Sequence, residues 1–214
     1  MASFLSGGKP IRIDHYAPGR GSSAPAVLLV HGSGGPLAGI DPYAPQAAAF
    51  GVHVFIVHFF DRTGHNWVYP SQIEENFRDW LETLTDALAF VRKEPGVDPD
   101  RVALLGFSLG SYLSLSLATQ DRRIAAVAEL FGGLPDHFLP DAANLPPVLI
   151  LHGEQDQVVP VEEAYKLERL LKGHRIPYEM KIYSGQGHVF RGLAQLDAMR
   201  RVASFFRRQL QLAA

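Results

Sequence analysis

The 214-residue sequence predicts a single α/β domain built on a mostly parallel sheet. Short apolar runs rich in β-branched residues alternate with longer segments of helical periodicity. Several runs are apolar at every position, as strands covered by helices on both faces must be. Hydrophobic residues make up 47% of the chain and charged residues 20%, and no composition shift marks a boundary. We therefore expect one domain over residues 1–214.

Seven apolar runs are the predicted strands, at residues 11–16, 26–31, 52–59, 101–107, 124–131, 148–152 and 178–183. The clearest helix covers about 71–93, where apolar residues recur at spacings of three and four and Pro95 follows. The last helix carries apolar residues on one side and arginines on the other. Only about fifteen residues separate the strands near Phe131 and Pro147, too few for a helical cap domain.

Composition excludes several kinds of site. The chain has no cysteine, which removes disulfides, Cys-ligated metals and a thiolate nucleophile. Its 20 Lys and Arg against 22 Asp and Glu form no long run, so the arginines of the last helix indicate a solvated face rather than a nucleic-acid surface. No apolar run has the length of a membrane span or a signal peptide. We expect a cytoplasmic protein that binds neither nucleic acid nor membrane.

A candidate nucleophile follows the strand at 101–107. Gly106-Phe-Ser108-Leu-Gly110 stands between this strand and an apparent helix, the setting of a G-x-S-x-G nucleophile elbow. The glycines let the backbone crowd together so that the Ser108 hydroxyl stands exposed. The alternative is a tight turn in which Ser108 only caps the helix.

The strand at 26–31 runs into a second glycine-rich loop, His31-Gly-Ser33-Gly34-Gly-Pro. A serine hydrolase needs two backbone N–H groups for its oxyanion, one after the nucleophile and one from such a loop. Leu109 and Ser33 are the candidates, with Gly34 as an alternate. A dinucleotide-binding loop would need glycine where Leu37 stands. We interpret His31 as a structural hydrogen-bonding residue under the loop.

A serine nucleophile needs a histidine base, and the histidine needs a carboxylate partner. The strand at 148–152 leads into a turn with Asp156, and the strand at 178–183 leads into a glycine-rich loop with His188. Both loops are expected at the carboxyl edge of the sheet, as is the elbow. The rival carboxylates are Glu154 and Glu129, and the rival histidine is His174.

Together these motifs resemble the α/β-hydrolase superfamily and, within it, the dienelactone hydrolase family. The resemblance implies an α/β-hydrolase fold without a large cap, and hydrolysis of esters or lactones without metal or cofactor. It implies the triad Ser108, Asp156 and His188. The name-giving members carry cysteine in the elbow where this chain has Ser108.

Such members also use arginines to hold a substrate carboxylate. Arg62 is similar to one such position, whereas Arg191 lies one place off the expected spacing; a surface ion pair is the alternative for both. Trp67, Tyr69 and Phe138 are candidate apolar walls of the substrate site, or loop aromatics that simply pack.

We therefore predict a serine-dependent hydrolase of small-molecule carboxylic esters or lactones, a monomer or small homo-oligomer. A peptidase or an acyl-thioesterase would use the same triad. A non-catalytic ligand-binding protein is the alternative from another class.

Overall fold

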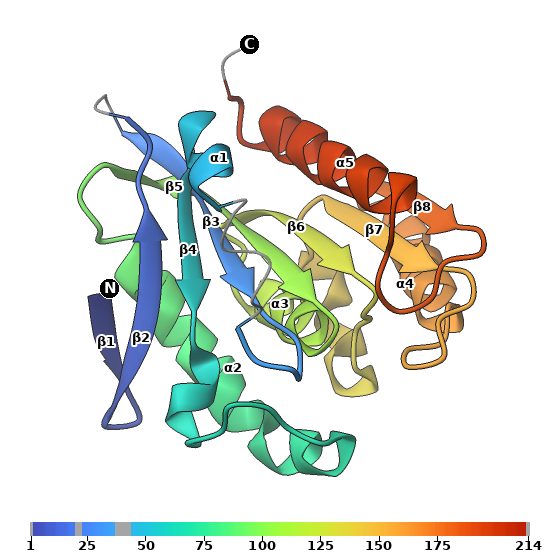
Figure 1. The fold of residues 1–214 in the computed structure, drawn as a ribbon, viewed down its shortest axis with the longest axis horizontal. Helices are drawn as coiled ribbons and strands as arrows, with labels where there is room; N and C mark the ends of the chain where they lie inside the picture. Colours follow the sequence, from blue (N-terminus) through green and yellow to red (C-terminus); the bar gives the residue numbers. More distant parts are fainter. Residues whose placement is uncertain (1, 20–22, 37–43, 213–214) are drawn as a thin grey trace.

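The computed structural model describes residues 2–19, 23–36 and 44–212. Their strands form one eight-stranded sheet in the order β1-β2-β4-β3-β5-β6-β7-β8 (Figure 1). The strands are β1 (Ala2–Ser6), β2 (Lys9–Tyr16), β3 (Ala24–Val30), β4 (His53–Val57), β5 (Val97–Phe107), β6 (Ile124–Leu130), β7 (Val148–Gly153) and β8 (Tyr178–Tyr183). Strands β1 and β2 pair antiparallel with their neighbours, and the others run parallel. The predicted mostly parallel sheet is confirmed.

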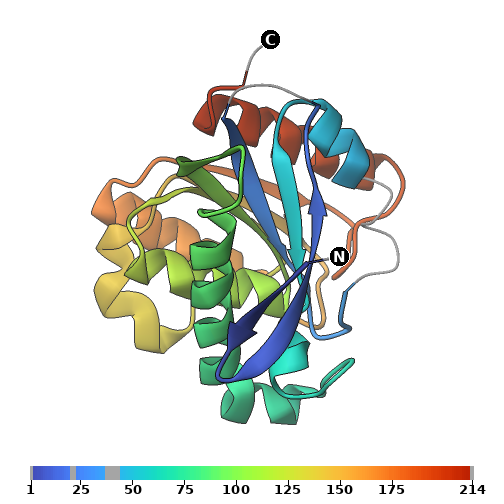
Figure 2. The ribbon, with the colours of Figure 1, turned by 90° about the vertical axis from the view of Figure 1, so that its left-hand side faces the viewer.

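Helices cover both faces of this sheet (Figure 2). They are α1 (Ala44–Ala49), α2 (Ile73–Val91), α3 (Leu109–Gln120), α4 (Glu162–His174) and α5 (Leu193–Gln209). Residues of α2, α3 and α4 pack in the core on one face, and residues of α1 and α5 in the core on the other. Alternation along β3 explains the arrangement, since Leu28 and Val30 enter the first core while Val27 and Leu29 enter the second.

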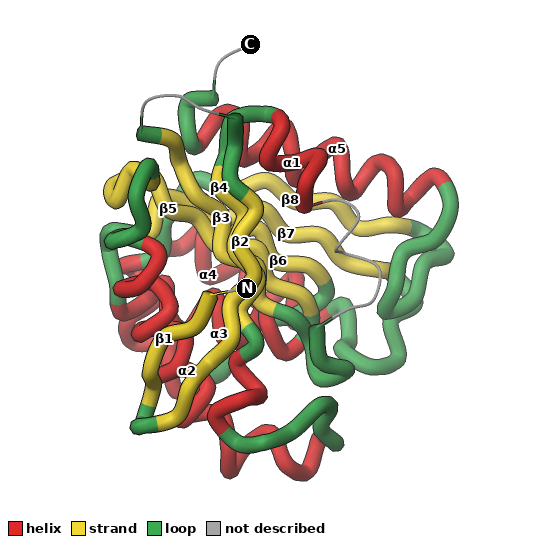
Figure 3. The backbone as a smooth tube through the Cα atoms, turned by 60° about the vertical axis from the view of Figure 1, so that its left-hand side comes forward, coloured by secondary structure: helices red, strands yellow, loops and turns green. Residues whose placement is uncertain are grey.

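The amino-terminal hairpin is a departure from the prediction, which began the sheet at residue 11. Strand β1 pairs with β2 through a turn at Gly7 and Gly8, both with positive φ, and the hairpin lies beside α2 (Figure 3). Phe4 stacks on Phe90 of α2 with ring centroids 5.6 Å apart. Most of β1 is exposed, so its sequence lacks the apolar run that marks a buried strand.

Other boundaries differ by a few residues. Strand β4 ends at Val57, and a 3₁₀ turn over Phe59–Arg62 replaces the predicted end of that strand. Strand β5 begins at Val97, before the predicted start, and the short helix α1 was not predicted. Between β6 and β7 there is only a 3₁₀ segment, Asp136–Asn144, so the predicted absence of a large cap is confirmed for these described residues. Over the described ranges, no helix has both the length and the hydropathy to cross a membrane.

Candidate active site

Ser108 occupies the sharp turn between β5 and α3. Its backbone has φ 52° and ψ −118°, a conformation that costs a non-glycine residue about 1–3 kcal/mol. The glycines on either side make the turn possible. A Cβ on Gly106 would lie 2.5 Å from the Gly110 oxygen, and one on Gly110 would lie 2.1 Å from the Val30 oxygen. The Ser108 side chain makes no cap hydrogen bond to α3, which removes the helix-cap alternative.

The hydroxyl of Ser108 lies within reach of His188, which follows β8. The Oγ atom is 3.0 Å from His188 Nε2, and His188 Nδ1 is 2.8 Å from Asp156 Oδ2. Because a carboxylate only accepts hydrogen bonds, Nδ1 carries the imidazole proton and Nε2 is free to accept from the serine. The structure thus brings the three predicted triad residues into one hydrogen-bonded chain.

Asp156 is held from both sides of its carboxylate. Its side chain is fully buried, and Oδ1 accepts the backbone N–H groups of Val158 at 2.8 Å and Val159 at 2.9 Å. His152 lies behind it, with Nε2 donating to the Val159 oxygen at 2.9 Å and lying 3.4 Å from Asp156 Oδ2. Burial lowers the pKa of His152. By holding Oδ1, the loop fixes the orientation of the carboxylate in which Oδ2 faces His188.

The rival residues are engaged elsewhere. Glu154 accepts a hydrogen bond from Ser184 at 2.7 Å, and His174 closes the carboxyl end of α4. Glu129 is completely buried, and its Oε2 accepts the Gly132 N–H at 2.9 Å. Among the carboxylates considered, it is Asp156 that contacts the His188 ring.

The loop after β3 packs directly on the nucleophile. A Cβ on Gly32 would lie 3.3 Å from the Ser108 Cβ. The Gly32 oxygen accepts hydrogen bonds from His31 Nδ1 at 2.8 Å and from the Gly35 N–H at 3.1 Å. Because a trans peptide points its N–H opposite to its carbonyl, these bonds also orient the N–H of Ser33.

His31 is the structural residue that the sequence indicated. Burial lowers its pKa to about 4, so the imidazole is neutral at physiological pH and donates through Nδ1. Leu109 is the first residue of α3, and the first N–H groups of a helix have no partner within it. The oxyanion roles of Ser33 and Leu109 remain predictions.

Two of the predicted substrate contacts need correction. Arg62 directs its guanidinium at Glu82 (3.1 Å) and Asp79 (3.6 Å) of α2, so the ion-pair alternative describes it. The same guanidinium lies against Gly7 in the β1–β2 turn, where a Cβ would overlap it. Phe138 is 8% exposed and packs in the core against Phe77, 6.2 Å between ring centroids, rather than forming an open wall.

Trp67 and Tyr69, which follow the 3₁₀ turn, are exposed, in contrast to Phe138. Trp67 and Tyr69 are 51% and 61% exposed, and their rings meet edge to face at 4.4 Å. Between them, the Val68 N–H donates to the Ser33 oxygen at 2.9 Å, which attaches this segment to the loop after β3. Their contact with substrate stays a prediction. Arg191 is exposed, and its backbone N–H donates to Gln186.

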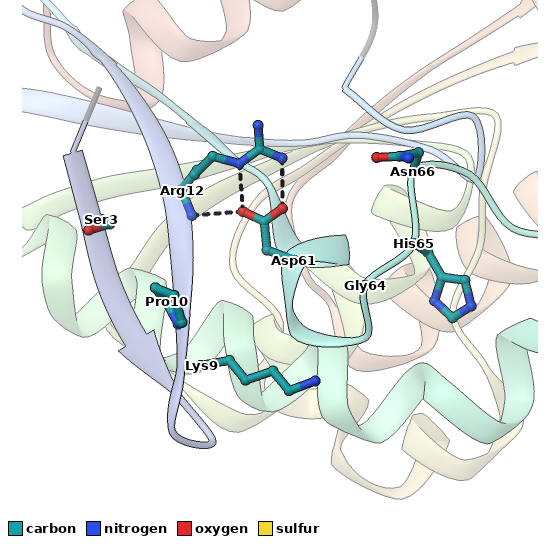
Figure 4. A pocket seen from close by; sticks show the side chains of 8 residues that line it. All are labelled: Ser3, Lys9, Pro10, Arg12, Asp61, Gly64, His65 and Asn66. Carbon is teal, nitrogen blue, oxygen red and sulfur yellow. Dashed lines mark hydrogen bonds and ion pairs between the residues drawn. The ribbon is translucent and has the colours of Figure 1, made fainter.

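Two adjoining hollows beside these elements were not predicted. The larger hollow, of about 600 Å³, has Arg12 and Asp61 in its wall, and their side chains pair at 2.7 and 2.9 Å (Figure 4). The smaller hollow, of about 260 Å³, shares Arg12 and Asp61 and reaches Gly34 and Pro36, next to Ser33 in the chain. Both hollows lie where the β1–β2 hairpin meets the segment after β4, a contact between distant segments that no local sequence pattern reveals.

Comparison with known proteins identifies the family of this chain. Residues 13–209 match the sequence model of the dienelactone hydrolase family. The chain is 33% identical over 125 residues to acyl-protein thioesterase 1 of Gibberella zeae, covering 55% of this chain and 52% of that protein. It is 26% identical over 132 residues to a carboxymethylenebutenolidase homolog of Xenopus tropicalis, covering 56% and 52%. The matches thus span about half the length of these two relatives.

The fold matches a solved structure over nearly its whole length. A dienelactone hydrolase-like promiscuous phosphotriesterase from metagenomic libraries superposes with a TM-score of 0.85, covering 97% of this chain and 96% of that one at 18% identity. At this identity the likeness establishes the fold alone. The family match and the α/β-hydrolase fold agree, and the chain belongs to the dienelactone hydrolase family of hydrolases.

Proposed function

We propose that the protein hydrolyses carboxylic esters or lactones through an acyl-enzyme on Ser108. One observation carries this proposal, the hydrogen-bonded chain from Ser108 through His188 to Asp156, with distances of 3.0 and 2.8 Å. A serine hydroxyl gains nucleophilicity when an imidazole can take its proton, and the imidazole must be held in the accepting tautomer. The buried carboxylate of Asp156 supplies that second condition.

The reaction begins when Ser108 Oγ attacks the ester carbonyl carbon and His188 Nε2 takes the hydroxyl proton. The carbonyl oxygen becomes an oxyanion, which the N–H groups of Ser33 and Leu109 would stabilise. Collapse of the tetrahedral intermediate breaks the carbon–oxygen bond, and His188 returns its proton to the leaving alkoxide. Water, deprotonated by His188, then attacks the acyl-enzyme, and the acid leaves as Ser108 regains its proton.

We infer that the substrate is an ester with one apolar and one polar end. Val158 and Val189 are 67% and 63% exposed and follow Asp156 and His188 within two residues. The smaller hollow, which also has Arg12 and Asp61 in its wall, reaches Gly34 and Pro36 of the loop after β3. We place the apolar part of the substrate against the valines and its polar part toward this smaller hollow, with Trp67 and Tyr69 at the opening.

A thioester substrate is the second candidate, because a relative of 33% identity over 125 residues is named an acyl-protein thioesterase. The same triad would also support peptidase activity, although a peptide bond has a less reactive carbonyl and a poorer leaving group than an ester. Against a ligand-binding role without catalysis stands the retention of all three triad groups in bonding geometry.

The test is a steady-state comparison of p-nitrophenyl esters, acyl-thioesters and peptide anilides with the wild-type protein. We expect the highest kcat/KM for the oxygen esters and a loss of several orders of magnitude in Ser108→Ala. Ser184→Ala, which changes an exposed serine bonded to Glu154, is the matched control and should keep wild-type rates. Faster turnover of thioesters would identify thioesters as the preferred substrates. Ester turnover that survives in Ser108→Ala would refute the proposed role of Ser108.

A further inference from the structure

A buried carboxyl lies next to the nucleophile and takes no part in the triad. Glu129 is on β6, opposite Gly106 of β5 and Ile150 of β7, and its side chain is fully buried. Its Oε2 accepts the Gly132 N–H at 2.9 Å. Its Oε1 has no hydrogen-bond partner within the described part of the chain. Burying such a group is unfavourable, so its retention at this place calls for a role.

The partner of Glu129 supports the nucleophile elbow. A Cβ on Gly132 would lie 2.3 Å from the Ser111 Cβ and 3.0 Å from the Ser108 oxygen. Two residues earlier, at the end of β6, the Leu130 oxygen accepts the Ser108 N–H at 2.9 Å. The end of β6 and the residues just after it therefore form the surface against which the backbone of Ser108 rests.

The residue between these contacts touches the catalytic imidazole. Phe131 has φ 47°, the left-handed region that a phenylalanine seldom adopts. Its N–H donates to the Leu151 oxygen at 2.8 Å, and its ring centroid lies 4.8 Å from that of His188. The hydrogen bond from Gly132 to Glu129 closes the turn with Phe131 inside it, and so holds the ring against His188.

We propose that Glu129 is a positioning residue, whose carboxyl holds the turn at Phe131 and Gly132 and thereby keeps Ser108 and His188 in bonding geometry. This inference rests on the proposed hydrolase function. Glu129 acts through the backbone and the Phe131 ring, because Asp156 already occupies the Nδ1 side of His188. Loss of the acceptor would leave the Gly132 N–H buried without a partner and free the turn to shift.

The surroundings of Glu129 indicate that the carboxyl is protonated at neutral pH. Burial raises its pKa to about 8, against the hydrogen bond from Gly132, which favours the charged form. The nearby phenol of Tyr112 is also neutral, because burial and the neighbouring carboxylates raise its pKa, so it places no charge beside Glu129. Glutamine is therefore a close neutral substitute that keeps an acceptor for the Gly132 N–H.

The test compares Glu129→Gln with Glu129→Leu in steady-state ester hydrolysis and in the rate of Ser108 labelling by a fluorophosphonate. A displacement of about 1 Å at reacting groups can cost about 100-fold in rate. We expect Glu129→Leu to lower kcat about 10- to 100-fold with KM within threefold, and Glu129→Gln to stay within about twofold of the wild type at pH 7. A folded Glu129→Leu protein with wild-type kcat, or with a change in KM alone, would overturn the inference.

If Glu129→Leu does not fold, Phe131→Leu tests the same inference. This variant keeps Glu129 and a buried apolar side chain but removes the ring beside His188. It should lower kcat about 10-fold, and an unchanged kcat would again overturn the inference. The wild-type protein separates the two proposals. Failure to label wild-type Ser108 refutes the hydrolase function, whereas equal labelling of wild-type and folded variant proteins refutes only the role of Glu129.

Discussion

The substitution Asp156→Asn tests how the loop after β7 controls the tautomer of His188. In the native protein Oδ1 accepts two backbone N–H groups, from Val158 and Val159, and Oδ2 accepts the Nδ1–H of His188. An amide of the same shape can turn its oxygen to only one side. Since two backbone donors outnumber one imidazole donor, we expect the oxygen to stay with the loop and the NH₂ group to face His188.

An NH₂ group facing Nδ1 stabilises the tautomer in which Nε2 carries the proton. Nε2 is 3.0 Å from Ser108 Oγ and would then donate to the hydroxyl instead of accepting from it. For Ser-His-Asp triads, this wrong tautomer lowers kcat about 10⁴-fold, which corresponds to about 5.5 kcal/mol of transition-state stabilisation. Folding should lose far less, about 1 kcal/mol, because both backbone hydrogen bonds survive.

The assay is hydrolysis of a p-nitrophenyl ester at pH 7, with urea unfolding to confirm that Asp156→Asn is folded. Glu154→Gln is the matched control, since Glu154 lies in the same turn and bonds Ser184 instead of His188. We expect the control to keep kcat/KM within about twofold. An Asp156→Asn protein that retains more than a tenth of wild-type kcat, or a Glu154→Gln protein that loses as much, would refute the reasoning.

Three further variants test other parts of the structure. Gly110→Ala places a Cβ 2.1 Å from the Val30 oxygen, so urea unfolding should show a loss of about 3 kcal/mol or more, and wild-type stability would contradict it. For Glu129, a folded-state pKa of about 8 lies above the ordinary 4.5, so wild-type stability should fall relative to Glu129→Gln as pH rises from about 4.5 to 8. At about 1.4 kcal/mol per pH unit the loss is on the order of 5 kcal/mol, and equal differences in unfolding free energy at pH 4.5 and 9 would disprove it. Arg62→Gln should keep kcat/KM within about twofold and lower stability by about 1 kcal/mol, since it breaks ion pairs to exposed carboxylates; a tenfold loss of activity would return Arg62 to the substrate site.

The triad was predictable because each of its residues follows a strand of the same parallel sheet. Apolar runs identified β5, β7 and β8, and the carboxyl ends of parallel strands share one edge. Residues far apart in the chain, such as Ser108 and His188, therefore had to meet there. The glycines of the elbow were predictable for a steric reason that the contacts of Gly106 and Gly110 confirm.

Features that depend on contacts between distant segments could not be predicted. Strand β1 is mostly exposed and is defined by its pairing with β2. Arg62 comes after β4, at a position where the family resemblance predicted a substrate-binding arginine. Its guanidinium instead forms ion pairs with carboxylates of α2. Phe131 adopts positive φ, although its residue type argues against it, because β6, β7 and Glu129 hold the backbone on both sides.

We propose above all that His188 activates Ser108 as a nucleophile. The most direct test of this proposal is reaction with a fluorophosphonate probe, followed by mass-spectrometric mapping of the modified residue. We expect a single modification at Ser108, abolished in His188→Ala and preserved in Ser184→Ala. A folded wild-type protein that stays unlabelled, or one labelled at another serine, would contradict it.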